Sequence, residues 1–315
     1  EVITEENMIA IGSVDELKAF RDDVNSGNTY EGKYVYLTGD ITLNINEEWE
    51  PIGVWVDGFS NPDSKPFKGI FDGCGYEIDY MKLGTSNYQA QGFFGGVYGG
   101  KIKNLGIGKN CSITGIADKT GAIVGFLYKN AELINCYNSS NINTSTIEVG
   151  GIIGTTNLNC KIYNCYNSGN ISIDSSIEDN VVIAYIGGIV GNNMNSEIIN
   201  CYNSGNVNFM GNNVAGIAGQ SIHDARIQNC YNIGNLNTNN DSATIVSLSK
   251  VDPNGLLNNN YYLNNCLNGT NAKVIIEGVF VKSEEEMKLL APILGAAFKE
   301  DTNNINNGYP ILIWQ

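Results

Sequence analysis

Two small groups of residues have the types and spacing that hydrolytic chemistry requires. Glu77 and Asp79 are two positions apart, so an extended strand points both carboxylates to one face. A glycoside hydrolase needs such a pair about 5 to 10 Å apart. His223, the only histidine, precedes Asp224 and Arg226 and could serve in acid–base chemistry. A solvated strand face explains the first group and a repeated column of charges explains Arg226, so we predict no catalytic residue and no enzyme activity.

Metal-dependent chemistry finds little support in the motifs. The chain has no HExxH, no CxxC and no EF-hand loop, and it lacks the cluster of Arg, Lys and Asp that a calcium-dependent lyase would need. Two further acids, Glu178 and Asp179, fall in a loop that enlarges one repeat. We therefore predict no cofactor and no metal, with calcium in an Asn/Asp-rich loop as the open alternative.

The charge balance excludes several classes of partner. The 315 residues include 33 Asp plus Glu against 18 Lys plus Arg, which gives a net charge of −15. A nucleic-acid surface needs clustered Lys and Arg, whereas the two arginines, Arg21 and Arg226, stand far apart. No apolar run approaches the roughly 20 residues of a membrane helix. We expect neither nucleic-acid binding nor membrane insertion.

These residues belong to a repeated unit that organises most of the chain. The unit is Gly-φ-φ-Gly, where φ is apolar, then a variable stretch, then φ-x-Asn-Cys-Tyr-Asn-x-Gly-Asn-φ. Copies begin at Gly150, Gly187 and Ala215, with looser ones at Gly121 and Gln91. A sixth copy places Asn260 in register before Tyr261 and Tyr262. Such a unit cannot bury its apolar face alone and must stack on its neighbours.

The repeats predict an all-β fold, a single right-handed parallel β-helix over residues 1–315. Continuous helical periodicity is interrupted by the glycine and asparagine blocks, which excludes helical repeats. Both solenoid ends need covering. We expect an N-terminal cap over 1–30 with a helix near 14–26, coils over 31–275 with the repeats at about 91–270, and a C-terminal cap over 276–315. The C-terminal cap should hold a helix near 284–298 that breaks or kinks at Pro292.

Stacking turns equivalent repeat positions into columns about 4.8 Å apart. One column alternates in charge without exception, as an outward-facing ladder would. A second is asparagine, which tolerates the left-handed corners of a coil and can bond to the next amide. We predict structural roles for both. The charged column is Lys101, Glu132, Lys161, Glu197 and Arg226, and the asparagine column is Asn135, Asn164, Asn200 and Asn229.

A third column holds cysteine and a fourth tyrosine. Leu105 at the cysteine place in the degenerate copy indicates an apolar, buried position rather than a disulfide or a metal site. Neighbouring residues of a strand face opposite ways, so tyrosines beside buried cysteines should face outward. Such rings could bind sugar, although rings that stack on each other explain them equally. The columns are Cys136, Cys165, Cys201 and Cys230, and Tyr137, Tyr166, Tyr202 and Tyr231.

With these residues in view, the chain resembles bacterial surface proteins that carry GLUG repeats. The resemblance rests on SVDELKAF, LTGDITL, WEPIG, FKGIFDGCGYEI, the NCYNSGN blocks and the closing NNGYPILIWQ. Similar repeats precede the catalytic part of immunoglobulin A-cleaving metalloproteases. The resemblance implies a secreted or cell-surface protein of a host-associated bacterium with a role in adhesion, and its partner would be a host surface or matrix ligand, including glycans. No zinc site carries over.

Three functions follow from this sequence. The first is a non-catalytic surface module that binds a host or glycan ligand through the tyrosine column. The second is a carbohydrate-active β-helix enzyme, a lyase or glycoside hydrolase. The third is a passive stalk that spaces another domain from the cell. The sequence leaves open the ligand, the anchoring, the oligomeric state and the redox state of Cys74, Cys111, Cys160 and Cys266.

Overall fold

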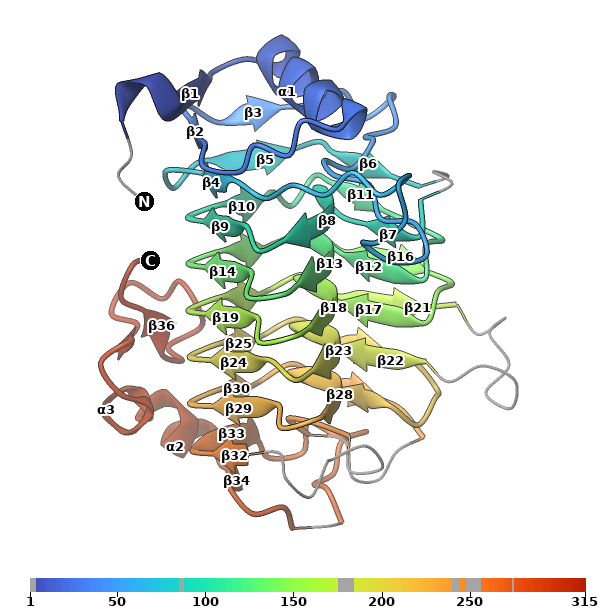
Figure 1. Ribbon diagram of the computed structural model, residues 1–315. Coiled ribbons are helices and arrows are strands. Elements are labelled where there is room, and N and C mark those ends of the chain that lie inside the picture. The colour runs from blue at the N-terminus through green and yellow to red at the C-terminus, as the bar shows by residue number, and fades with distance from the viewer. Residues whose placement is uncertain (1–3, 85–87, 175–183, 240–243, 248–255, 274) are drawn as a thin grey trace.

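The protein is a parallel β-solenoid of about eight turns (Figure 1). This computed structural model describes residues 4–84, 88–174, 184–239, 244–247, 256–273 and 275–315. Each complete coil passes through five stacks of strands, here named sheets I to V, before it returns to sheet I one layer further along. Glu178 and Asp179, in the enlarged loop, lie outside the described residues.

Sheets I and II meet at the corner that carries the Asn-Cys-Tyr-Asn blocks. In spatial order, sheet I consists of β1 (Met8–Ile11), β2 (Tyr34–Leu37), β4 (Ile70–Asp72), β9 (Lys101–Lys103), β14 (Glu132–Ile134), β19 (Lys161–Tyr163), β24 (Glu197–Ile199), β29 (Arg226–Gln228) and β32 (Leu256–Asn258). Sheet II consists of β3 (Ile41–Thr42), β5 (Glu77–Asp79), β10 (Gly106–Ile107), β15 (Tyr137–Asn138), β20 (Tyr166–Asn167), β25 (Tyr202–Asn203), β30 (Tyr231–Asn232), β33 (Asn260–Leu263) and β34 (Val279–Lys282).

The other three sheets complete the coil. Sheet III consists of β6 (Lys82–Leu83), β11 (Ser112–Ile113), β16 (Ile142–Thr144), β21 (Ile171–Ile173), β26 (Val207–Asn208) and β31 (Leu236–Asn237). Sheet IV consists of β7 (Ala90–Gln91), β12 (Lys119–Gly121), β17 (Glu148–Gly150), β22 (Tyr185–Gly187) and β27 (Val214–Ala215). Sheet V consists of β8 (Phe94–Tyr98), β13 (Val124–Tyr128), β18 (Ile153–Asn157), β23 (Val190–Met194) and β28 (Ala218–Ile222).

Stacked apolar columns fill the inside of the coils. Leu133, Ile162 and Ile198 are adjacent partners in sheet I and are fully buried. The Gly-φ-φ-Gly blocks form the turn from sheet IV to sheet V. A Cβ atom on Gly187 would lie 1.9 Å from the carbonyl oxygen of Val190, so only glycine permits this close turn.

Helix α1 (Val14–Ser26) lies across the N-terminal end of the solenoid (Figure 1). It begins at Ser13, whose hydroxyl accepts a hydrogen bond from the Glu16 backbone N–H at 3.2 Å, and it ends at Gly27 in the left-handed conformation. Its Leu17, Phe20 and Val24 are buried in the main core. The preceding residues form the short 3₁₀ helix η1 (Glu5–Asn7) and then β1, which pairs with β2.

The C-terminal region differs from the predicted cap. After β34, residues 283–315, here named the strap, turn back along the side of the solenoid over sheet II (Figure 1). The strap contains α2 (Glu284–Lys288), α3 (Ala291–Leu294) and a hairpin of β35 (Phe298–Lys299) and β36 (Ile311–Leu312). Its apolar side chains pack on tyrosines of sheet II and bury them.

The helix predicted near 284–298, with a break or kink at Pro292, is two short helices in the structure, and the break falls before Pro292, between Lys288 and Ala291. Ser283 and Glu286 form the predicted capping box at the start of α2. Pro292 then lies in the first turn of a second helix, where its missing N–H breaks no helical bond, and Gly295 ends that helix. Among the described residues, no helix combines the length and the apolar character that crossing a bilayer requires.

Candidate functional site

The charged column lies in register on sheet I. Its two ends form ion pairs, Lys101 Nζ to Glu132 Oε2 at 2.6 Å and Arg226 Nη1 to Glu197 Oε1 at 3.5 Å. Because these side chains are partly exposed, each pair contributes less than about 1 kcal/mol. The alternating charges of the column therefore favour one strand register. The adjacent partners are Lys101–Glu132, Glu132–Lys161, Lys161–Glu197 and Glu197–Arg226.

The asparagine column is a continuous ladder of side-chain amides at the corner between sheets I and II. Every member has a φ between 52° and 56°, the left-handed region. Each Nδ2 donates a hydrogen bond to the Oδ1 of the asparagine in the preceding coil. The distances are 3.1 Å for Asn135 to Asn104, 3.1 Å for Asn164 to Asn135, 3.0 Å for Asn200 to Asn164 and 3.1 Å for Asn229 to Asn200. Asn104 in turn donates to Asp72 Oδ1 at 2.9 Å.

The sixth copy is displaced by one residue from the predicted register. Asn259, not Asn260, continues the ladder, and its Nδ2 donates to Asn229 Oδ1 at 2.8 Å. Tyr261, not Tyr262, pairs with Tyr231. Asn260 takes the buried cysteine place, where its amide bonds to the Ile227 carbonyl and the Cys230 N–H. The corner needs the left-handed residue, and Asn259 has a φ of 54°.

A second amide ladder was missed by the sequence interpretation. It uses the last asparagine of each Asn-Cys-Tyr-Asn block, on sheet II, and these side chains are fully buried. Asn138 Nδ2 donates to Asn167 Oδ1 at 2.9 Å, and the next two steps are 2.8 Å each. Each Nδ2 also donates to a backbone carbonyl two residues on, so the buried amides are satisfied. The ladder is Asn138, Asn167, Asn203 and Asn232.

The cysteine column faces the interior between these ladders. Cys136, Cys165, Cys201 and Cys230 are fully buried, and all eight cysteines of the chain are free thiols in this structure. Burial raises the pKa of the Cys165 and Cys230 thiols. No group of three His, Cys, Asp or Glu residues that could hold a metal ion is present within the described ranges.

The tyrosine column forms one stack of nearly parallel rings. Ring centroids are 5.1, 5.0 and 4.9 Å apart along the stack, and the interplanar angles are 4° or less. Tyr137 ends the stack over Gly106, where a Cβ atom would lie 2.2 Å from the ring. This missing side chain lets the Tyr137 hydroxyl reach Glu77 Oε2 at 2.8 Å.

The expected row of exposed tyrosines is wrong for half of the stack, because the strap covers it. Tyr202 and Tyr231 are 1% and 0% exposed. Gln315 Nε2 donates to the Tyr202 hydroxyl at 3.0 Å, and Asn306 Nδ2 donates to the Tyr231 hydroxyl at 2.8 Å. These two rings therefore cannot serve as a ligand platform.

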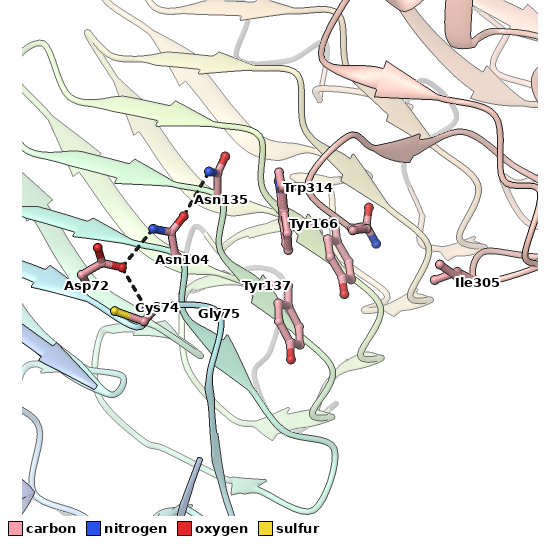
Figure 2. Close-up of a pocket in the computed structure, with 10 residues that line it drawn as sticks. Asp72, Cys74, Gly75, Asn104, Asn135, Tyr137, Tyr166, Ile305 and Trp314 are labelled. Carbon is pink, nitrogen blue, oxygen red and sulfur yellow. Dashed lines mark hydrogen bonds between the residues drawn. The ribbon is translucent and has the colours of Figure 1, made fainter. Parts of the chain in front are cut away.

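The other half of the stack borders a pocket of about 560 Å³ (Figure 2). Trp314 of the strap stacks at 28° and 29° on Tyr166 and Tyr137, and its Nε1 donates to the Asn164 carbonyl at 3.0 Å. The pocket thus has an aromatic wall and, opposite, the N-terminal end of the amide ladder. Its lining is Asp72, Cys74, Gly75, Asn104, Asn135, Tyr137, Tyr166, Ile305, Trp314 and Gln315.

Asp72 is the charged residue that lines this pocket, and four groups hold its carboxylate by hydrogen bonds or an ion pair. Burial alone would raise its pKa, but hydrogen bonds from the Tyr34 hydroxyl, Asn104 and the Cys74 N–H lower the pKa below its ordinary value. Lys103 Nζ lies 3.0 Å from Asp72 Oδ2. Asp72 is therefore an ionised, fixed carboxylate at neutral pH.

Cys74 and His223 do not lie in one site. Burial and the Asp72 charge raise the pKa of the Cys74 thiol, which disfavours the nucleophilic thiolate. His223 lies in the turn between β28 and β29, and β29 is five strands from β4 in sheet I. At about 4.8 Å per strand, these corners are about 24 Å apart along the solenoid axis.

Glu77 and Asp79 lie side by side on β5, behind the pocket. A Cβ atom on Gly108 would lie 2.5 Å from Glu77 Oε1 and from Asp79 Oδ1, so these oxygens are at most about 5 Å apart. Burial chiefly raises the pKa of Glu77. Asp79, however, is held by the Asn110 backbone N–H and Nδ2, and neither carboxylate lines the pocket, which stops at the Tyr137 ring.

Comparison with known proteins connects one coil to a described motif. Residues 184–208 match the model of the GLUG motif. The chain carries a GLUG motif. These residues run from β22 through β26 and so form one complete turn of the solenoid. The GLUG turn is thus the structural unit that stacks, and it contains Asn200, Cys201 and Tyr202 of the ladders.

Solved structures with similar folds carry protease names. A crystal structure from Bacteroides ovatus, provisionally named an immunoglobulin A1 protease, has a TM-score of 0.71 at 24% identity, and the match covers 99% of this chain and 94% of that one. A structure named IgA1 protease has a TM-score of 0.59 at 17% identity and matches 90% of this chain but only 22% of its own. These likenesses show the fold. No curated protein matches the chain.

The pocket residues outside the asparagine and tyrosine columns were not predicted. Trp314 and Gln315 lie in the NNGYPILIWQ tail, which the sequence interpretation assigned to an end cap, and Asp72 lies in FKGIFDGCGYEI before the clear repeats. The one available signal was the tryptophan that ends an apolar tail. No spacing in the repeats connects Trp314 to Tyr166, because the contact spans about half the chain.

Proposed function

We propose that this chain is a non-catalytic surface module of a bacterial protein, and that it binds a carbohydrate on a host cell or matrix. The ligand seat is the pocket beside Tyr137, Tyr166 and Trp314. The observation that carries the proposal is the assembly of three stacked aromatic rings opposite a row of side-chain amides. Sugars need both an apolar surface and hydrogen-bonding groups, and the pocket has the volume of a small-ligand site.

The resemblance to GLUG-repeat surface proteins supports the cellular context of this proposal. Secretion or display on the cell surface brings the module to external ligands. The competing functions make different demands. A stalk would need no pocket, and an enzyme would need a carboxylate at the seat that can exchange a proton, whereas Asp72 is fixed by four groups.

The test is binding of the purified chain to an array of host and plant glycans, mucins and matrix proteins. We expect saturable binding to glycans that Trp314→Ala weakens at least tenfold. Tyr128→Ala is the matched control, because it removes a partly exposed ring from sheet V, away from the pocket. Silence across the array would overturn the proposal in favour of a stalk, and release of reducing ends or unsaturated sugars would overturn it in favour of an enzyme.

A further inference from the structure

The pocket has a shape and a charge that select among sugars, and this selection rests on the proposed function above. Its aromatic wall is short. Tyr137 and Tyr166 have centroids 5.1 Å apart, and the next ring, Tyr202, is covered by the strap. Trp314 lies 5.8 and 6.3 Å from these two rings and closes the wall. The open platform is therefore about the size of one sugar ring and not an extended track.

The opposite wall offers unused hydrogen-bonding capacity. In the ladder, Asn104 and Asn135 each use one N–H of Nδ2 and one lone pair of Oδ1. An amide carries two N–H hydrogens and two oxygen lone pairs. A donor and an acceptor thus remain on each of these two side chains, in two successive coils about 4.8 Å apart. Two hydroxyl groups on one ring edge present the complementary pattern.

The charge of the lining opposes an acidic ligand. The ten lining residues include one carboxylate, Asp72, and no lysine or arginine. Lys103 pairs with Asp72 from behind, and its Nζ also lies 5.2 Å from the Tyr34 ring centroid. Glu77 lies behind Tyr137, and the chain as a whole carries a net charge of −15. A sialic acid or uronic acid carboxylate would meet the like charge of Asp72, with only the neutral amide N–H groups of Asn104 and Asn135 as donors and with Lys103 already paired to Asp72.

We infer that the pocket binds a single neutral pyranose ring, which packs beside the Tyr137, Tyr166 and Trp314 rings with its hydroxyl groups on the Asn104 and Asn135 amides, and that it rejects acidic sugars. The strap residues Trp314 and Gln315 complete the site, so the ligand is a chain end or a short branch. A long polysaccharide along the ladder would meet the strap.

The experiment titrates the full chain with single-ring probes and follows two signals. The neutral probes are methyl glucoside, methyl galactoside, methyl mannoside and N-acetylglucosamine, and the acidic probes are glucuronate and N-acetylneuraminate. Tryptophan fluorescence comes from Trp49, Trp55 and Trp314, of which only Trp314 lines the pocket, so the ligand-dependent change is assigned by its loss in Trp314→Phe. Alkylation of Cys74 by iodoacetamide reports occupancy independently, because Cys74 lines the pocket and is the exposed thiol while the other seven are buried. A mildly alkaline buffer offsets its raised pKa.

We expect at least one neutral probe to change the fluorescence saturably and to slow Cys74 alkylation, with acidic probes at least tenfold weaker. Asn135→Ala should weaken neutral binding at least fivefold. Asn200→Ala is the matched control. Asn200 has the same left-handed backbone conformation and the same two side-chain hydrogen bonds to neighbouring asparagines, but it does not line the pocket. This substitution should perturb stability equally and leave binding unchanged.

Three outcomes would overturn the inference. Acidic probes that bind as tightly as neutral ones, with Cys74 protected, would reject the charge selection and leave carbohydrate binding standing. Equal losses in Asn135→Ala and Asn200→Ala would reject amide recognition. If no single-ring probe changes either signal, and if the chain binds no glycan on the array or binds only a peptide, both the inference and the proposed function would be rejected.

Discussion

The two halves of the tyrosine stack differ although one sequence motif builds both. Tyr202 and Tyr231 lie beneath the strap, and their hydroxyls bond to it. Tyr137 and Tyr166 have the same flanking residues in the sequence, the same register and nearly the same ring spacing, but they border a pocket. The repeat therefore sets where the rings lie, and the non-repeating strap decides which rings a ligand can reach.

Within one column, the covered tyrosines stabilise the fold and the open tyrosines border the proposed ligand site. The covered half is a small second core that joins the strap to the solenoid. The open half adds charged groups, since Glu77 bonds to Tyr137 and Asp72 ends the amide ladder beside it. Substitutions should accordingly affect stability in the covered half and binding or pH response in the open half.

The largest effect should come from Tyr231→Ala in the covered half. This removes a fully buried ring and two hydrogen-bond contacts to the strap. We expect a loss of about 3 to 5 kcal/mol in the free energy of unfolding, measured by urea denaturation. Tyr137→Ala, in the partly exposed half, should cost about 1 to 2 kcal/mol. Equal losses would contradict the distinction between the halves.

Asp72→Asn should show how the open half depends on charge. The lowered pKa of Asp72 means that its ionised form stabilises the fold, fully above the ordinary value of 3.8, and that this contribution disappears as pH falls through the folded pKa. We expect the variant to lose about 1 to 3 kcal/mol at pH 7. In urea titrations the gap to the parent should narrow below pH 3.8, and a constant gap would contradict the prediction.

Glu77→Gln should act in the opposite direction. Burial raises the pKa of Glu77, so the protonated form is favoured in the fold. Its stabilising contribution is present below the ordinary value of 4.5 and is lost as pH rises through the folded pKa. The glutamine side-chain oxygen can still accept the hydrogen bond from the Tyr137 hydroxyl, and the partly buried negative charge is gone. The variant should therefore be more stable than the parent at pH 7 by less than about 1 kcal/mol. At pH 4 the two should unfold together.

Lys161→Glu tests a column with no covered half. It places three glutamates at adjacent positions of sheet I, because Lys161 pairs with Glu132 and Glu197. Like charges directly opposite should cost about 0.5 to 1 kcal/mol at low salt. Since these side chains are partly exposed, 1 M salt should remove most of the loss. Lys161→Gln is the control for loss of the positive charge alone.

The sequence predicts the solenoid well because its information is local and repeated. Each turn restates the glycine block, the inward apolar residue and the left-handed asparagine, and these fix the stacking register. The error at the sixth copy arose because Asn258, Asn259 and Asn260 are consecutive. The sequence does not show which of three adjacent asparagines adopts the left-handed backbone conformation. The buried ladder beginning at Asn138 was visible in the motif but was not separated from the corner ladder.

The pocket was only half predictable for the opposite reason. Tyr137, Tyr166 and Asn135 come from the repeats, so their columns were found. Trp314 contacts Asn164 across 150 positions, and an apolar tail of this kind can pack on any exposed apolar face. The strap contacts tyrosine rings and hydroxyl groups from successive coils, and these lie side by side only after the solenoid has formed.

The side-chain amide dipoles of the two ladders point in opposite directions along the solenoid axis. In the corner ladder every N–H points toward the N-terminal end, so the amide dipoles add and place their positive end against the Asp72 carboxylate. In the buried ladder, Asn138 donates toward Asn167 and the dipoles point the opposite way. The two rows cancel along most of the rod, and each added coil polarises its neighbours without building up a net field. The corner ladder extends one coil beyond the buried ladder at each end, to Asn259 and to Asn104, and at the Asn104 end its unopposed dipoles meet Asp72, beside the pocket.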